Sequence, residues 1–416
     1  MDHNQEIDVP PFFLCPISLQ IMKDPVTVST GITYDRENIE KWVFTNNNSI
    51  CPVTKQPLNI DSPDSFLTPN HTLRRLAQSW CTLNASNGVE RFPTPKPPVT
   101  KAQVLKLIDQ SSNSSAHRLV MNLEKIKCIA YGSSGNKRCL ETTPGVADFL
   151  TRLIILGQND DVDNKCSSSV SDEALRILAH LQISDETVLK KMLNENNLLD
   201  SLVRIMQKNS YESRADAVGI MKLLIQVAEP TQVVSLTRQH FEEVVQLIKL
   251  KDDVSPKSTK AALKVLALAC PWGRNRIKVV EAGAVQVMVE LLLESNDRRT
   301  SEMVLAVLEQ LSGCAEGRAE LLSHAAGLAV VSKKILRVSH FATERGVKIL
   351  FAIAKYSGSP SVVQEMIQTG VVTKLCLVLQ VDCEAKTKEK TREILKMHAR
   401  AWKNSPCAPA HVFGSF

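Results

Sequence analysis

The chain has 416 residues, of which 44% are hydrophobic and 23% charged, and its formal net charge is +6. This composition is typical of a globular protein that is long enough for more than one core. The positive charge is mild and forms no basic stripe with interleaved aromatic residues, so nucleic-acid binding is not indicated. No run approaches about eighteen apolar residues and no signal-peptide pattern is present, so we expect neither a membrane span nor a leader.

The cysteines indicate a reducing compartment. Eleven of them are scattered along the chain, an odd number without the regular framework of a disulfide-rich secreted protein. We therefore expect free thiols and a cytoplasmic location, with the nucleus as a second compartment.

Two short segments near the N-terminus begin like halves of a zinc site. Residues 15–18 read Cys-Pro-Ile-Ser, and residues 51–54 read Cys-Pro-Val-Thr. Ser18 and Thr54 stand where a Cys-x-x-Cys pair needs its second thiol, and no further cysteine precedes Cys81. Two tetrahedral zinc sites need about eight ligands, so we expect no metal and no cofactor.

A polar cross-brace is expected in place of zinc. An unpaired buried polar group costs about 1–3 kcal/mol. We therefore expect the polar side chains of the two loops and their neighbours to form hydrogen bonds with one another inside the fold. Neither Cys15 nor Cys51 has a neighbouring histidine that would generate a thiolate, so a buried structural role is favoured over a catalytic nucleophile. The residues expected in the network are Cys15, Ser18, Asp35, Arg36, Cys51, Thr54, Lys55 and Asn70.

A hairpin and two helices are predicted between and after these segments. The β-branched runs 26–28 and 32–34 flank a turn at 29–31. Asp35 is placed to cap a helix, because its carboxylate would accept the free N–H groups of the first turn. This helix carries Ile39, Trp42 and Val43. A second helix is predicted at 72–83, with Leu73, Leu76, Ala77, Trp80 and Leu83 on its apolar face and Arg74 and Arg75 in solvent.

Taken together, these residues resemble the U-box, the zinc-free relative of the RING finger. The motifs that match are Phe13–Ser18, Asp24–Val26, Gly31, Tyr34–Arg36, Ile39, Trp42, Cys51–Pro52, Pro69–Asn70 and Leu73. Their order over a long segment is far more specific than one short motif. In that family the two loops and the helix between them bind a ubiquitin-conjugating enzyme.

The resemblance implies a binding surface at matching positions, namely Ile17, Leu19, Trp42, Pro52 and Lys55. Trp42 follows Ile39 by three residues, so a core position is the alternative interpretation. Ile17 lies in a predicted loop, which favours exposure. Lys55 stands where many members have arginine, and lysine lacks the planar five-donor fork of that residue.

A proline-rich segment follows the predicted U-box. Residues 84–100 are polar and then proline-rich, which favours a stiff, extended linker. A ligand for proline-recognition domains is the alternative. The predicted boundaries are 1–83 for the U-box, 84–100 for the linker, 101–403 for a helical array and 404–416 for a mobile tail.

The array shows a repeat. Gly283, Gly327 and Gly370 open apolar helices at intervals of 44 and 43 residues. Stepping back at this period gives His240 and Asn197. Gly145 precedes Asn197 by 52 residues, and a polar loop at 159–171 accounts for the excess.

The period and the helices within each unit resemble armadillo repeats, with HEAT repeats as the related class. Such units stack into a superhelix with a concave binding surface. The last helix is predicted at Cys383–Lys403 and caps the array. The fold class is therefore mainly α: a small α+β U-box followed by an α-superhelix of armadillo repeats.

This order of domains is similar to that of plant U-box ubiquitin ligases. The resemblance implies a conjugating enzyme charged with ubiquitin on the U-box, a protein substrate on the repeats, and transfer without a covalent ligase intermediate. It also implies a homodimer through the U-box and a role in turnover during stress or immune signalling. Two alternatives stay open: an armadillo scaffold whose U-box has lost its partner, and a metal-dependent RING enzyme.

Overall fold

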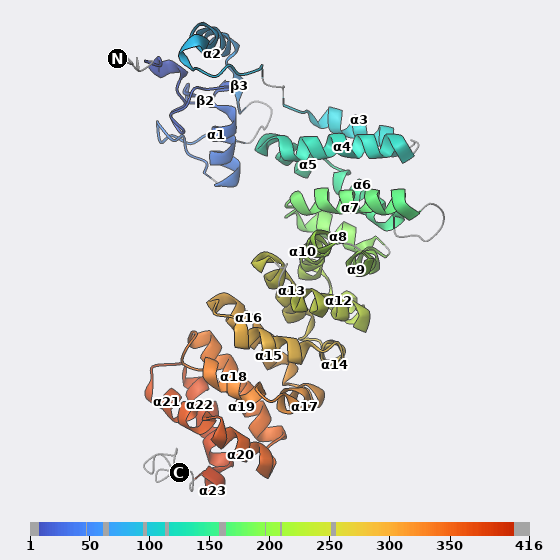
Figure 1. Cartoon of the computed structure of the whole chain (residues 1–416), viewed down its shortest axis with the longest axis vertical. Coiled ribbons are helices and arrows are strands. Elements are labelled where there is room, and N and C mark those ends of the chain that lie inside the picture. Colours follow the sequence, from blue (N-terminus) through green and yellow to red (C-terminus); the bar gives the residue numbers. More distant parts are fainter. Residues whose placement is uncertain are drawn as a thin grey trace. The chain divides into compact units, whose positions relative to one another are not determined.

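The structure is a computed structural model. It describes residues 8–46, 48–60, 66–94, 98–112, 116–157, 164–195, 197–208, 210–250 and 255–402. The chain divides into two compact units, Met1–Phe149 with His180–Gln182, and Leu150–Ala179 with Ile183–Phe416 (Figure 1). The tail expected at 404–416, and residues 95–97 of the expected linker, lie outside the described residues.

A three-stranded antiparallel sheet belongs to the first unit. β1 (Pro25–Thr27) pairs with β2 (Thr33–Asp35) and also with β3 (Thr68–Pro69). The predicted hairpin is confirmed, and Gly31 in its turn has a positive φ of 82°, which glycine adopts without strain. The sequence does not predict β3, because a two-residue strand that contains proline carries no strand pattern.

The two predicted helices beside this sheet begin within one residue of the expected start, but the first continues as a π-helix, and two short 3-10 helices were not predicted. The elements are η1 (Pro11–Phe13), α1 (Arg36–Glu40), the π-helix η2 (Lys41–Thr45), α2 (His71–Leu83) and η3 (Ala85–Asn87). Asp35 precedes α1, but its side chain does not cap the helix. Its Oδ1 instead accepts hydrogen bonds of 2.8 Å from the main-chain N–H groups of Lys23 and Asp24.

The predicted apolar face of α2 is wrong in part. Leu76 and Leu83 are exposed, the latter by 79%, whereas Ala77 and Cys81 are buried. Arg74, expected in solvent, is half-buried in an ion pair. α2 contacts the small sheet at β1, where Leu73 packs on the core and Trp80 lies beside Phe13, and both of these side chains are only half-buried.

Three further helices complete the first unit: α3 (Lys101–Ser112), α4 (Ala116–Gly132) and α5 (Ser134–Thr142). The end of α1 packs on α5. Glu40 is only 4% exposed, and its carboxylate accepts a hydrogen bond of 2.9 Å from the main-chain N–H of Gly135. The guanidinium of Arg138 lies 4.5 Å from the ring centre of Phe44.

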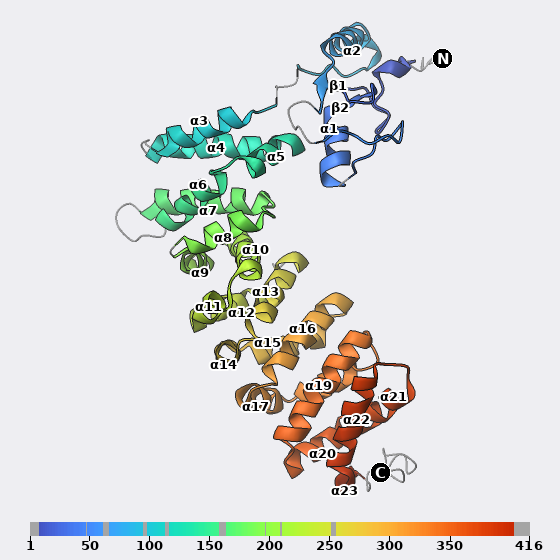
Figure 2. The ribbon, with the colours of Figure 1, turned by 180° about the vertical axis from the view of Figure 1, so that it is seen from behind.

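The second unit is helical. After α6 (Val146–Leu156), which begins in the first unit, come α7 (Asn164–His180), α8 (Glu186–Asn194), α9 (Leu198–Lys208), α10 (Tyr211–Val227), α11 (Pro230–Ser235), α12 (Arg238–Lys249), α13 (Pro256–Ala269), α14 (Gly273–Glu281), α15 (Ala284–Glu294), α16 (Arg298–Leu311), α17 (Ala315–Ser323), α18 (Gly327–Lys334), α19 (His340–Tyr356), α20 (Pro360–Gln368), α21 (Val371–Gln380), α22 (Ala385–Met397) and α23 (Ala399–Trp402). They repeat in threes, such as α14, α15 and α16. The third helices, α10, α13, α16, α19 and α22, pack on one another in succession (Figure 2).

The predicted register holds at five positions, and at four of them the residue before the helix is left-handed. Gly145, Asn197, Gly283 and Gly370 directly precede α6, α9, α15 and α21, with positive φ values of 87°, 76°, 79° and 72°. The left-handed residue therefore marks the corner where the second helix of a repeat begins.

The predicted register is wrong at His240. This residue is buried inside α12, which begins earlier, at Arg238. Gly327 opens α18 as predicted, because it is the first residue of that helix, but it has no positive φ. A Cβ at Gly327 would lie 2.0 Å from the main-chain oxygen of Leu321, so this glycine is needed for close packing and not for a left-handed corner.

Two other expectations require correction. The polar loop predicted at 159–171 is helical from Asn164 onward, where α7 begins, and 159–163 lie outside the described residues. The terminal helix is broken at His398 into α22 and α23. A nitrogen of the His398 ring lies 3.0 Å from the carbonyl oxygen of Ala354, which ties this break to α19.

Within the described part of the chain, no single helix has the length and apolar composition to cross a membrane. One pair of helices, α20 with α21, meets both criteria together, and these two are bent by 67°.

Replacing Gly327 with alanine should destabilise the second unit. A Cβ there would lie 2.0 Å from the main-chain oxygen of Leu321, so the backbone must shift, and overpacking costs about 1–3 kcal/mol. Gly219→Ala is the control. Gly219 lies within α10 with open space around it, so this variant should raise the free energy of unfolding by about 0.5–1 kcal/mol, because glycine in a helix is less stable than alanine by that amount. Denaturant unfolding of the full chain measures both. A stable Gly327→Ala variant would contradict the packing described here.

Candidate functional site

The two Cys-Pro loops are structural copies of each other. Residues 15–20 and 51–56 share the pattern Cys-Pro-x-Ser/Thr-x-Gln. In the first loop, the N–H of Cys15 donates to the carbonyl of Gln20 at 2.8 Å; in the second, the N–H of Cys51 donates to that of Gln56, also at 2.8 Å. The sequence thus encodes one loop geometry twice.

Both loops contain a non-glycine residue in the left-handed region. Leu19 has φ 57° and Lys55 has φ 59°, a conformation that costs such residues about 1–2 kcal/mol. Their N–H groups donate back to the carbonyls of Cys15 at 2.8 Å and Cys51 at 3.0 Å. The two side chains are exposed, Leu19 by 74%.

The sulfur of Cys15 holds the first loop against the start of α1. This side chain is fully buried. Its Sγ accepts hydrogen bonds from the main-chain N–H of Asp35 at 3.3 Å and from Nδ2 of Asn38 at 3.6 Å. The same Nδ2 donates to Oγ of Ser18 at 3.0 Å. Asn38 therefore bridges both ends of the Cys-x-x-Ser segment.

Charged groups extend this first cluster. Nε of Arg36 donates to Oδ2 of Asp24 at 2.6 Å, next to the N–H groups that Asp35 accepts. Burial raises the pKa of Asp35, and the hydrogen bonds from Asp24 and Lys23 lower it less. The Asp35 carboxylate therefore binds main-chain N–H groups just before β1, whereas the Asp24 carboxylate binds arginine side chains.

The sulfur of Cys51 is the centre of a second cluster. Sγ lies 3.0 Å from the hydroxyl of Tyr34, and Oγ1 of Thr30 donates to it at 3.3 Å. The Tyr34 oxygen also accepts the N–H of Val53 at 3.3 Å. Burial raises the pKa of the Cys51 thiol, but hydrogen bonds from Thr30, Thr54 and Tyr34 together outweigh it and lower the pKa to about 6.

The predicted polar residues therefore form two clusters and not one network. Asn70 belongs to neither, because its Oδ1 caps α2 by accepting the N–H of Leu73 at 3.0 Å. Thr54 accepts the N–H of Gln56 at 3.4 Å, and the Lys55 side chain is exposed. Sequence reasoning missed four members of the clusters, Asp24, Thr30, Tyr34 and Asn38. The sequence pattern around the hairpin and α1 predicts strands and a helix at these positions, and it does not indicate which of their side chains contact the buried sulfur atoms.

The predicted docking residues differ in exposure. Leu19 and Lys55 are exposed, whereas Ile17, Trp42 and Pro52 are half-buried. Ile17 and Trp42 pack on the core of the sheet. The copied loop pattern supplies two exposed apolar side chains that the prediction omitted, Ile50 and Val53.

Trp42 joins the helix to the second loop. Its Nε1 donates to the main-chain oxygen of Ile50 at 2.9 Å. The sequence allows two alternatives for Trp42, a core position and an exposed docking position. The side chain is half-buried and packs on the core, and part of it remains accessible beside the loop.

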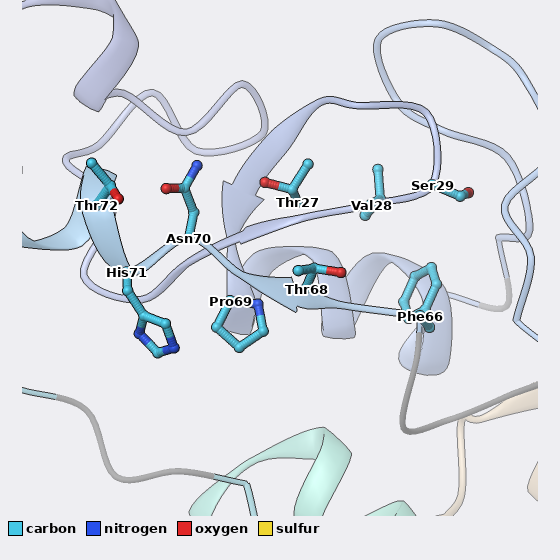
Figure 3. Close-up of a pocket in the computed structure, with 9 residues that line it drawn as sticks. All are labelled: Thr27, Val28, Ser29, Phe66, Thr68, Pro69, Asn70, His71 and Thr72. Atoms are coloured by element: carbon cyan, nitrogen blue, oxygen red, sulfur yellow. The ribbon is translucent and has the colours of Figure 1, made fainter.

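A pocket of about 530 Å³ lies elsewhere on the first unit. It is formed by segments 27–29 and 66–72, from β1, β3 and the start of α2 (Figure 3). None of the five predicted docking residues lines it. In the described part of the chain, no group of three or more His, Cys, Asp or Glu side chains is arranged to hold a metal ion.

Tyr34→Phe should destabilise the fold by about 1–3 kcal/mol, because it removes one hydrogen bond of the buried Cys51 sulfur and the hydroxyl that accepts the N–H of Val53. Tyr356→Phe is the control, since its ring is 62% exposed. Denaturant unfolding of the full chain measures both. Equal stability of the two variants would contradict the role assigned to Tyr34.

The deficit of Tyr34→Phe should also grow with pH. The pKa of Cys51 is lowered from 9.0 to about 6 in the folded chain. Its thiolate therefore stabilises the fold fully above about pH 9, and this contribution is lost as the pH falls through about 6. Tyr34 supplies one hydrogen bond to that thiolate, so its removal should cost more at pH 9 than near pH 5.5.

Comparison with known families identifies both parts of the chain. The family described as "U-box domain" matches residues 9–86, and that described as "Plant U-box protein ARM repeat region" matches residues 103–415. Two relatives from Arabidopsis thaliana match this chain over nearly the full length of both proteins. E3 ubiquitin-protein ligase PUB22 is 50% identical over 99% of both chains, and E3 ubiquitin-protein ligase PUB23 is 52% identical over 98% of this chain and 97% of its own.

Solved structures agree on the fold of the repeats. A structure from work on a phosphorylation switch in the interaction of cadherin and β-catenin has a TM-score of 0.57 at 13% identity, covering 79% of this chain and 59% of its own. This likeness concerns the fold alone. The family matches and the two relatives that span the whole chain show that the protein belongs to the plant U-box family with armadillo repeats and is a ubiquitin–protein ligase.

Proposed function

We propose that the two copied loops and the helix between them bind a ubiquitin-conjugating enzyme charged with ubiquitin. The observation that carries the proposal is the paired geometry of Leu19 and Lys55, which occupy equivalent left-handed positions and are both exposed. Strain of this kind persists only where the surrounding structure holds it, and it clusters at binding sites. The proposed contact residues are Ile17, Leu19, Trp42, Pro52 and Lys55, to which Ile50 and Val53 add apolar area.

The chemistry of this surface fits such a partner. The exposed side chains of Leu19, Ile50 and Val53 are apolar and lie on loops that are tied to a rigid sheet. These loops would then lose little conformational freedom on binding, which favours affinity. Lys55 adds a cation beside them, and we assign to it a hydrogen bond where ubiquitin meets the conjugating enzyme.

We propose that ubiquitin passes directly from the conjugating enzyme to a substrate lysine. Cys15 and Cys51 are fully buried. Although the pKa of Cys51 is low, the hydrogen bonds that lower it occupy its sulfur, so it is unsuited to attack a thioester. The ligase would supply rate by restraining the thioester in a reactive pose and by raising the local concentration of the acceptor lysine.

The armadillo array would hold the substrate. The continuous row of α10, α13, α16, α19 and α22 offers a long surface built from one repeated element, as repeat proteins use for extended partners. We also propose a cytoplasmic or nuclear location, supported by the buried free thiols of Cys15, Cys51, Cys81, Cys270 and Cys376. A homodimer through the U-box and a role in stress or immune signalling are proposals that rest on the family resemblance.

Leu19→Ala should abolish most ubiquitin transfer while leaving the fold intact, because this side chain is largely in solvent. Leu293→Ala, which removes a half-exposed leucine of α15, is the control and should keep the activity of the unmutated chain. The assay combines ubiquitin, ATP, an activating enzyme and a panel of conjugating enzymes, and the rate of self-ubiquitylation is measured. We expect a loss of about tenfold or more for a central apolar contact.

Transfer by folded Leu19→Ala at the unmutated rate would show that the docking surface lies elsewhere. If the unmutated, folded chain shows no self-ubiquitylation with any conjugating enzyme of the panel, an armadillo scaffold that does not bind conjugating enzymes would be favoured instead.

A further inference from the structure

The outward face of α19 lies in the middle of a three-helix surface. α19 packs between α16 and α22, towards the C-terminal end of the array (Figures 1 and 2). One side of the helix supplies core residues such as Val347 and Leu350. The exposed or half-exposed side chains of the other side are Phe341, Glu344, Arg345, Lys348, Phe351, Lys355 and Tyr356.

Part of this face is electrically neutral. Arg345 forms an ion pair with Glu309 of α16. Nζ of Lys348 lies 3.5 Å from the same carboxylate and 2.6 Å from that of Glu344. Two cations and two carboxylates thus balance each other within the protein, and this part of the surface has no charge left for a partner.

Two lysines near the end of α19 lie over aromatic rings instead. Nζ of Lys355 is 5.6 Å from the ring centre of Phe351 and 5.3 Å from that of Tyr356. Nζ of Lys390, from α22, is 4.7 Å from the ring centre of Phe351. Among the described residues, neither lysine forms an ion pair.

A third cation is held at the same place. Cζ of Arg318 lies 5.1 Å from the ring centre of Tyr356. Its Nε donates to Oγ of Ser357 at 3.1 Å and its NH1 donates to the carbonyl of Ser312 at 3.0 Å. Because none of these partners is a carboxylate, the positive charge of Arg318 adds to that of the two lysines.

Aromatic rings hold these ammonium groups without neutralising them. A cation over an exposed ring gains only about 0.5–1 kcal/mol, and a lysine ammonium has three N–H donors. A carboxylate would therefore find positioned donors and uncompensated charge. Tyr356 is 62% exposed and Phe351 is half-exposed, so apolar side chains next to the carboxylate would find aromatic area, as in protein interfaces.

We propose that Lys355, Lys390, Phe351 and Tyr356, here called the lysine–aromatic surface, bind an acidic peptide segment of the protein to be ubiquitylated. Aspartate or glutamate side chains of this segment lie against the two lysines, and its apolar residues contact the rings. The proposal deepens the proposed function and rests on it, since it names the chemistry by which the array selects a substrate.

Charge complementarity favours this occupant over two others. Residues 404–416 of the chain itself contain no aspartate or glutamate. A nucleic acid would need positive charge along a longer surface, but the neighbouring part of α19 is neutral because Arg345 and Lys348 are paired with Glu309 and Glu344. A peptide is short enough to keep its acidic groups on the lysine–aromatic surface alone.

The test uses the full chain and three fluorescein-labelled probes in low salt, with binding followed by anisotropy. The first probe is a peptide of three Glu-Glu-Tyr-Gly units, the second replaces every Glu by Gln, and the third is a short oligothymidylate. The unmutated chain should bind the acidic peptide about tenfold or more tightly than the glutamine peptide, with affinity that falls as salt screens the charges. It should bind the oligothymidylate weakly.

The paired variant Lys355→Glu with Lys390→Glu should weaken binding of the acidic peptide about tenfold or more, and Lys355→Ala with Lys390→Ala should weaken it less. Lys249→Glu with Lys333→Glu is the matched control, because it makes the same change of net charge at two exposed lysines of α12 and α18. An equal loss in the control, equal binding of both peptides, or oligothymidylate binding that is lost in the first variant would each overturn the proposal.

Self-ubiquitylation separates this proposal from the proposed function. The Lys355→Glu, Lys390→Glu variant should form ubiquitin ladders at the unmutated rate, since its U-box is unchanged. Ladders from the unmutated chain, together with no binding of the acidic peptide by that chain, would overturn the lysine–aromatic surface alone. Peptide binding by a folded chain that forms no ladders would overturn the proposed function and leave the surface without a role in substrate selection.

Discussion

Two buried sulfur atoms anchor the loops of the U-box to one short strand. The Cys51 sulfur meets the hydroxyl of Tyr34, and the Cys15 sulfur accepts the main-chain N–H of the next residue, Asp35. Both residues belong to β2. Because both cysteines are fully buried, a movement of either loop would leave donors unpaired in the interior at a cost of about 1–3 kcal/mol each. One strand thus sets the relative position of two loops that are far apart in sequence.

This anchoring explains how a zinc-free domain keeps strained residues at its surface. Leu19 and Lys55 are held in the left-handed region by hydrogen bonds back to the anchored cysteines. Their side chains extend into solvent from equivalent points of two copied loops. The hydrogen-bond clusters therefore hold the proposed docking surface in one conformation, as metal ligation does in a RING finger, and a surface ordered before binding favours affinity.

Much of the fold was predictable because its signals are local. The hairpin follows from β-branched runs around a turn, and the repeat follows from left-handed corners before apolar helices, seen at Gly283 and Gly370. The partners of the buried sulfurs were not predictable, since Asn38 and Tyr34 look like ordinary helix and strand residues. Asp35 shows the limit most clearly: its local pattern indicates a helix cap, yet tertiary structure brings two loop N–H groups to its carboxylate instead.

The most direct test of this account is the zinc content of the purified chain together with its activity after metal removal. The protein is treated with a chelator and dialysed into magnesium, and self-ubiquitylation is compared before and after treatment. If hydrogen bonds hold the two loops, the chain should contain far less than one zinc ion, and its rate of self-ubiquitylation should not change after chelation. About two zinc ions per chain, or activity that is lost on chelation and restored by zinc, would contradict the account.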